Sequence, residues 1–241
     1  MPSNQSPQIL GTAPIGKLLV EYSLPAIIAM TVVSLYNVID SIFIGHGVGA
    51  MAIAGLAITF PLMNLIIAFC TLVGVGSATI SSIFMGQKDV QRATLVLHNA
   101  TILLLVNGIL VTIVTLIFLD PILLFFGASH ETLPYARDFM QVILIANPIA
   151  YLFVGLNNLM RATGYPRKAM LSSFLTVAVN VVVAPIFIFL LGWGIRGAAL
   201  ATAIAQLTGL VWVLAHFLNK NNYISFKKGY FRLHRRIIAS I

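Results

Sequence analysis

In a chain of 241 residues, hydrophobic residues make up 59% and charged residues only 8%, whereas a soluble domain carries about 25% charged residues. Together with a mean hydropathy of +1.00, this composition excludes a soluble globular protein and indicates an all-α integral membrane protein. The single cysteine, Cys70, excludes a disulfide framework.

The first apolar stretch runs from Leu18 to Ile44 and is interrupted by Pro25 and by an acid, Asp40. A helix needs about 20 apolar residues to cross a bilayer core, so this stretch is long enough to span it. A charge in the hydrocarbon region costs at least about 2.5–3.5 kcal/mol, and such residues usually face the protein interior and carry function. Tyr36 lies one turn before Asp40 on the same helix face. Asp40 can therefore exchange a proton or coordinate a hard cation; the alternative is a carboxylate that meets water at the helix end.

Six apolar segments of spanning length follow one another, each bounded by polar, glycine or proline residues. They run over residues 17–44, 51–84, 94–119, 132–160, 168–191 and 195–218. The sequence therefore predicts a six-transmembrane-helix bundle. We expect a segment at 1–16, the bundle at 17–218 and a basic linker at 219–241.

The positions of the basic residues predict the orientation of the bundle. With the N-terminus inside, twelve of the fourteen lysines and arginines fall on the inner side, and only Arg137 and Arg196 fall outside. Because basic residues are enriched in cytoplasmic loops, we expect a multi-pass protein of the cell (inner) membrane with both ends of this chain in the cytoplasm. The net charge of +8 is thus a topology signal, and no nucleic-acid partner is expected.

The fifth segment places Asn180 in an apolar run, five residues before Pro185. Proline leaves the carbonyl one turn upstream without its helical donor, and broken helices of this kind coordinate ions in transporters. Asn180 can therefore line an ion site, or it can simply hydrogen-bond a neighbouring helix. Pro25 and Pro185 are the expected conformational hinges.

Sequence patterns typical of catalysis are missing from the chain. It contains no phosphate-binding loop, no GxSxG or HExxH motif and no paired intramembrane catalytic residues. An enzyme is therefore not expected, nor is any cofactor. ATP-driven transport by this chain alone is excluded, so uphill transport would draw on an ion gradient.

Four motifs in chain order resemble the N-terminal half of a multidrug and toxic compound extrusion (MATE) transporter. They are PAIIAMTVVSLYNVIDSIFIGHGVG from Pro25, GLAITFPL at 55–62, RATGYPRKAM at 161–170 and GIRGAALATAIAQ at 194–206. The resemblance covers essentially the whole chain. It implies one lobe of a twelve-helix, two-lobe antiporter that exports organic and cationic drugs in exchange for H⁺ or Na⁺.

The resemblance also implies where the ion-coupling site lies. Carried over residue by residue, it falls on Tyr36, Asp40, Asn157, Asn180 and Thr202, and any Na⁺ would be held at Asp40, Asn180 and Thr202. One position departs from the family pattern, because Ala184 stands where many members carry an aspartate directly before the proline. The coupling ion stays open between Na⁺ and H⁺, with a lean toward H⁺.

Two alternatives remain beside the antiporter. A lipid-linked precursor flippase from the related superfamily would line its cavity with several basic residues, and the spans contain almost none. A non-transporting membrane scaffold or half-transporter would pair with a second copy of this chain. The antiporter hypothesis expects small-molecule organic substrates, the lipid bilayer, and a missing C-terminal lobe or a second copy as partners.

Overall fold

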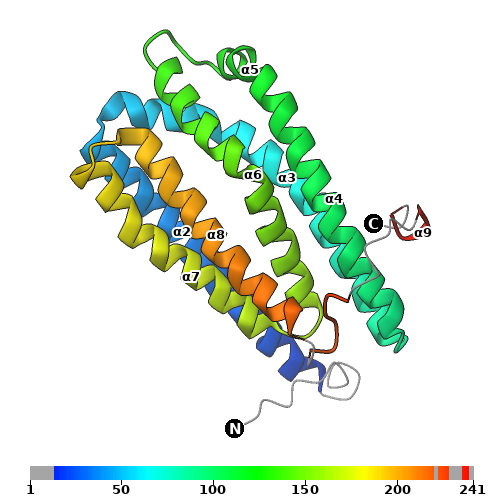
Figure 1. The fold of residues 1–241 in the computed structure, drawn as a ribbon. Coiled ribbons are helices and arrows are strands. Elements are labelled where there is room, and N and C mark those ends of the chain that lie inside the picture. The colour runs from blue at the N-terminus through cyan, green and yellow to red at the C-terminus, as the bar shows by residue number, and fades with distance from the viewer. Residues whose placement is uncertain (1–13, 220–221, 228–234, 239–241) are drawn as a thin grey trace.

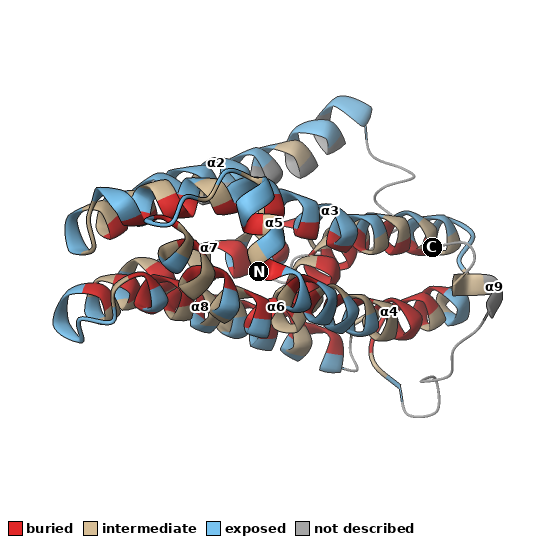
Figure 2. Ribbon diagram, turned by 90° about the horizontal axis from the view of Figure 1, so that it is seen from above, coloured by how far each residue is buried: buried red, intermediate tan, exposed pale blue. Residues whose placement is uncertain are grey.

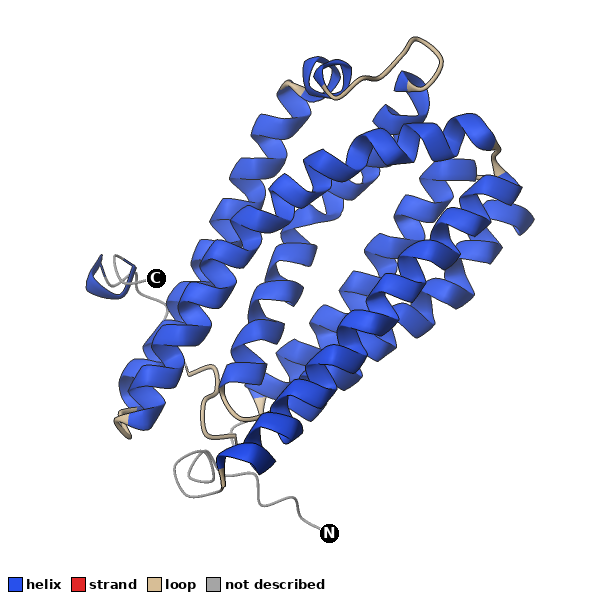
Figure 3. Cartoon of the chain, turned by 180° about the vertical axis from the view of Figure 1, so that it is seen from behind, coloured by secondary structure: helices blue, strands red, loops and turns tan. Residues whose placement is uncertain are grey.

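Long helices run up and down beside one another in the computed structural model, which describes residues 14–219, 222–227 and 235–238 (Figure 1). The long helices are α2 (Ile15–Gly47), α3 (Ala50–Gly86), α4 (Val90–Ile117), α6 (Leu133–Ala162), α7 (Pro166–Pro185) and α8 (Gly194–Leu218). The short ones are α5 (Leu119–Phe125), the π-helix η1 (Ile186–Leu190) and α9 (Arg235–Ile238). Figure 3 shows the described chain as helices joined by short loops.

The predicted six-span, all-α fold is confirmed. Within the described residues, α3, α4, α6, α7 with η1, and α8 are each long and apolar enough to cross a membrane. The 33 residues of α2 form a helix about 50 Å long at 1.5 Å per residue, which also exceeds the bilayer core. The division into segments at 1–16 and 219–241, and the side of the membrane on which the ends lie, stay predictions.

The short helix α5 was not predicted, because the third apolar segment was expected to continue to residue 119. The sequence places Pro121 four residues after Ile117, where its ring clashes with that carbonyl and its missing N–H leaves the carbonyl unpaired. The structure therefore ends α4 at Ile117 and starts α5 at Leu119. Asp120 lies in the first turn of α5, where the helix dipole favours a negative charge.

The bundle consists of two groups of three helices. One group is α3, α4 and α6, the other is α2, α7 and α8, and the contact between α6 and α8 joins them (Figure 1). Buried residues lie on the faces that meet inside the bundle, whereas the outer faces are exposed and apolar (Figure 2). Such outward apolar faces suit a protein whose solvent is lipid. A cavity lined by residues of both groups lies between them.

Residues 222–227, which follow α8, lie against the bundle. The amide of Phe226 donates to the Phe217 carbonyl at 2.8 Å, and the amide of Lys227 donates to Nε2 of His98 at 3.1 Å. His98 is fully buried in α4, and its Nδ1 lies 2.8 Å from the Thr94 carbonyl. Segment 222–227 is therefore tied to the end of the bundle where α4 begins and α8 ends.

Candidate functional site

Three helices meet at a cluster of three polar side chains. The side-chain amide of Asn180 in α7 donates to the Tyr36 hydroxyl in α2 at 3.2 Å and to Thr202 Oγ1 in α8 at 3.1 Å. The Tyr36 and Thr202 oxygens are 3.0 Å apart. Thr202 donates its proton to the Ala198 carbonyl at 3.2 Å, so Tyr36 is the donor between these two hydroxyls. The cluster Tyr36–Asn180–Thr202 joins residues that are far apart in the sequence.

Asp40 lies one turn above Tyr36 and is buried, with an exposed fraction of 8%. Its Oδ1 atom has no hydrogen-bond partner among the described residues. The alternative of a carboxylate that meets water at the helix end does not fit this burial. A buried carboxylate oxygen without a donor is costly, and the cost is relieved when the group binds a proton or a cation.

Asn157 lies apart from the cluster. Its side-chain amide donates to the Ala169 carbonyl at 3.0 Å and to Ser172 Oγ at 2.6 Å. These contacts tie α6 to the first part of α7, two turns or more from Asn180 along that helix. Asn157 therefore shares the cavity with the cluster but does not touch it.

All five predicted ion-coupling residues line one cavity of about 360 Å³ between the two groups of helices. Its apolar wall includes four large side chains, Phe60, Met63, Phe139 and Phe153. Its polar lining also includes seven residues that were not part of the predicted site, namely Asn37, Ser41, Asn158, Arg161, Ser173, Thr176 and Gln206. A cavity that combines large apolar side chains with polar groups can bind a small molecule.

The hydroxyl residues of the additional lining, Ser41, Ser173 and Thr176, could not be recognised from the sequence, because hydroxyls in membrane helices commonly bond their own backbone. Thr176, for instance, donates to the Ser173 carbonyl at 2.7 Å, as threonines in helices commonly do. Gln206 did carry a signal, since it lies one turn after Thr202 in α8. Arg161 also carried one, as a base one turn after Asn157.

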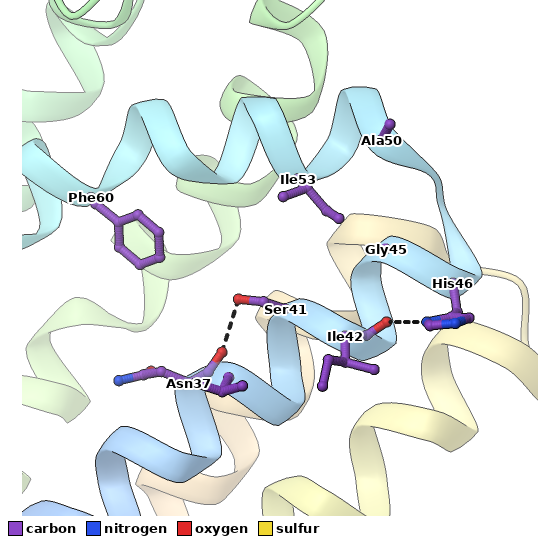
Figure 4. Close-up of a pocket in the computed structure, with 9 residues that line it drawn as sticks. Asn37, Ser41, Ile42, Gly45, His46, Ala50, Ile53 and Phe60 are labelled. Atoms are coloured by element: carbon purple, nitrogen blue, oxygen red, sulfur yellow. Dashed lines mark hydrogen bonds between the residues drawn. The ribbon is translucent and has the colours of Figure 1, made fainter.

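A second, wider pocket of about 640 Å³ lies between α2 and α3. Figure 4 shows Ser41, Gly45 and His46 of α2 beside Ala50, Ile53 and Phe60 of α3, with the Ile53 side chain pointing toward α2. Asn37, Ser41 and Phe60 line this pocket and the cavity alike. The two spaces therefore adjoin at these three residues.

The structure describes the two predicted hinges, Pro185 and Pro25, to different extents. α7 ends at Pro185 and continues as the π-helix η1, in which the Leu191 amide donates to the Ile186 carbonyl at 3.0 Å. Short π-helical turns are frequent at functional sites. Pro25 falls within α2, but its side chain lies outside the described residues. Ala184, at the position of the expected second carboxylate, is fully buried.

A Na⁺ ion at this site would depend on few charges. Within the part of the chain that the structure describes, no three His, Cys, Asp or Glu side chains lie close enough together to hold a metal ion. Asp40 would be the single carboxylate, and the Thr202 hydroxyl and the Asn180 amide oxygen would be neutral donors. A monovalent cation suits such a set better than a transition metal does.

Comparison with known proteins identifies the family. Residues 25–186, more than half of the chain, match the sequence model of the family described as MatE. The multidrug export protein MepA of Staphylococcus haemolyticus (strain JCSC1435) is 32% identical over 210 residues, which cover 87% of this chain and 46% of that protein. The chain spans about half the length of the curated relatives it matches.

Solved structures agree with this assignment. A MATE protein crystallised in the bent conformation has a TM-score of 0.86 at 30% identity, covering 92% of this chain and 50% of that one. The outward-facing conformation of a multidrug resistance MATE family transporter has a TM-score of 0.85 at 31% identity, covering 92% and 49%. The chain belongs to the MatE family of MATE transporters.

Proposed function

We propose that this chain is the N-terminal lobe of a secondary antiporter that exports organic and cationic drugs in exchange for H⁺ or Na⁺. The observation that carries the proposal is the unpaired oxygen of Asp40 in a cavity with a polar cluster on one wall and large apolar side chains on another. Relatives described as a multidrug export protein and as a multidrug resistance transporter support drugs as the substrate class.

The proposed coupling is a competition between two states of the cavity. An ion can drive export only if the ion and the drug bind the two states with different affinities. Ionised Asp40 offers a negative charge to a cationic drug, and the neutralised group no longer does. A proton or Na⁺ at Asp40 therefore favours the state that has released the drug.

Two structural elements would carry the change between states. α2 holds Tyr36 and Asp40, and it contains Pro25, so we propose that it bends there when Asp40 is neutralised and narrows the cavity. α7 contributes Asn180 and ends at Pro185, where it passes into η1. The cluster Tyr36–Asn180–Thr202 links both helices to α8. A movement of one helix therefore strains or breaks its hydrogen bonds to the other two.

The lean toward H⁺ rests on the number of carboxylates. Asp40 is the single carboxyl group among the described residues that line the cavity, and Ala184 provides no second one. One carboxyl suffices to carry a proton, whereas a Na⁺ site gains from each added charged oxygen. A lipid-linked precursor flippase is less well supported, since Arg161 is the single basic residue among those described in the lining.

The test is ethidium efflux from cells that express the complete gene, with Na⁺ and pH gradients imposed separately. We expect efflux by the wild type, driven by the pH gradient, and its loss in Asp40→Asn. Glu131→Gln is the matched control, since Glu131 is exposed and lies outside the cavity lining. Efflux driven by the Na⁺ gradient but not by the pH gradient would identify Na⁺ as the coupling ion. Equal efflux and equal drug-release rates in wild type and Asp40→Asn would contradict the proposed mechanism.

A further inference from the structure

The cavity carries a second charged side chain that the proposed coupling does not use. Among the described residues that line it, Asp40 and Arg161 are the charged ones. Arg161 lies in the last turn of α6 and is half-buried. The helix dipole stabilises any base in the last turn of a helix. That stabilisation does not explain why Arg161 also lines the cavity.

The direction of α6 explains why Arg161 lines the cavity. The Cα–Cβ bonds of a helix tilt toward its N-terminus, and long side chains follow them over the preceding turn. Since Arg161 lies at the C-terminal end of α6, its Cα–Cβ bond is directed toward the middle of the bundle. Asn158 precedes it by three residues on the same helix face and lines the same cavity.

Arg161 has no counter-ion among the residues that the structure describes. Carboxylates lie within ion-pair distance of Arg92, Arg137 and Arg196, but none among the described residues does so for Arg161. A half-buried guanidinium without an anion lacks the partner that normally offsets its desolvation. Its five N–H groups form a planar fork that matches a carboxylate with two parallel hydrogen bonds.

Asp40 cannot be that partner, because the two charges lie at opposite ends of the cavity. The hydrogen bond between Asn180 and Tyr36 places Tyr36 beside Asn180 along the axis of α7. The hydrogen bond between Asn157 and Ser172 places Asn157 beside Ser172 along the same axis. The eight residues from Ser172 to Asn180 span about 12 Å of helix. Asp40 and Arg161 each lie about one turn further out, so they are on the order of 20 Å apart along the bundle.

We infer that Arg161 forms an anion-accepting subsite at its end of the cavity, which binds the carboxylate of an amphiphilic organic compound. A single guanidinium neutralises a single negative charge, which suits a carboxylate better than a phosphate dianion. The side-chain amide of the neighbouring Asn158 can donate a hydrogen bond to its oxygens, and the aromatic wall can hold its apolar body. This inference rests on the proposed function, because it takes the cavity to be the substrate cavity.

The test uses two dyes that differ in one group, tetramethylrhodamine with a free carboxylate and its methyl ester. Binding to the chain in phosphatidylcholine nanodiscs is measured by fluorescence polarisation. We expect Arg161→Gln to weaken binding of the acid by about tenfold or more and to leave the ester unchanged. Arg161→Lys retains the charge and should recover part of the acid affinity. Arg167→Gln, which removes an exposed guanidinium outside the cavity lining, is the matched control and should change neither.

The remaining outcomes overturn the inference in distinguishable ways. Equal loss of both dyes in Arg161→Gln would give Arg161 a structural role only. A wild type that binds the ester but not the acid would exclude the anion subsite and leave the proposed drug cavity intact. A wild type that binds neither dye would exclude both the anion subsite and the proposed drug cavity. Loss of acid binding when phosphatidylglycerol is added to the nanodiscs would assign Arg161 to a lipid headgroup instead.

Discussion

Asn180 donates its side-chain amide to the Tyr36 hydroxyl at 3.2 Å although 144 positions separate the two residues in the chain. The same amide reaches Thr202 at 3.1 Å, so α2, α7 and α8 are held at a common level. A hydrogen bond between membrane helices contributes about 0.6 kcal/mol on average. The cluster therefore contributes less through energy than by fixing how the three helices are placed around Asp40.

Replacing Tyr36 by phenylalanine tests the cluster. Tyr36→Phe keeps the ring but removes the hydroxyl that lies between Asn180 and Thr202, so we expect stability to fall by about 0.5–1.5 kcal/mol. Thermal unfolding of the purified chain in detergent measures the change. Tyr135→Phe serves as the control, since Tyr135 lies at the opposite end of α6 from the cavity's Arg161 and outside the cluster. An unchanged midpoint in Tyr36→Phe, with the control also unchanged, would show that the cluster does not hold the helices.

The close contact of α3 with α6 predicts a second effect on stability. A Cβ atom added at Gly55 would lie 2.9 Å from Tyr135 Cβ and 3.1 Å from the Thr132 carbonyl oxygen. Both atoms belong to or adjoin the backbone, so Gly55→Ala forces the helices apart, and we expect a loss of about 1–3 kcal/mol.

Gly86→Ala is the matched control for Gly55→Ala, because it lies in the same helix and a Cβ atom there meets nothing within 4 Å. Alanine has the higher helix propensity, so the control should unfold no earlier than the wild type. Equal midpoints for the two variants in detergent would contradict the tight contact at Gly55.

Much of the fold could be predicted because hydropathy alone reports which segments enter a membrane. The six spans, the break at Pro185 and a buried Asp40 follow from apolar runs, one proline and one charge. The break after Ile117 was missed, because residues 94–119 read as one continuous apolar run although Pro121 follows closely. Hydropathy cannot show that a helix stops inside such a run.

The site could be predicted only in part. Asp40 and Asn180 could be recognised as polar residues in apolar runs, and Tyr36 follows from helical spacing. Their meeting with Thr202 could not be derived from periodicity, because nothing in one chain states that α2 and α8 lie side by side. From the sequence, Arg161 indicates only the topology, since bases at the inner ends of spans usually do so. That reading does not say which way its side chain points.

The ion pairs at the end of the bundle near α5 are expected to matter little. Arg196 donates to Asp138 at 2.8 Å, and Arg137 donates to Asp120 through Nε at 2.7 Å. Their side chains are between 36% and 59% exposed, and exposed pairs usually contribute about 0–1 kcal/mol. We expect the coupling between Arg196→Gln and Asp138→Asn, measured by a double-mutant cycle of thermal unfolding, to stay below about 1 kcal/mol and to shrink as salt is added. A larger, salt-independent coupling would show that the pair is shielded from solvent.

The segment after α8 should be released when its aromatic contact is removed. The Phe226 ring packs edge-on against His98 with ring centroids 5.3 Å apart, and the next amide, that of Lys227, donates to the same histidine. Phe226→Ala removes the ring and weakens both contacts, so local opening becomes easier. We expect trypsin to cleave after Lys227 about tenfold faster than in the wild type, because cleavage follows the population of the open form. Tyr223→Ala, at a residue that is 37% exposed, should be cleaved at the wild-type rate. Equal rates for Phe226→Ala and the wild type would mean that the segment is held by its backbone hydrogen bonds instead.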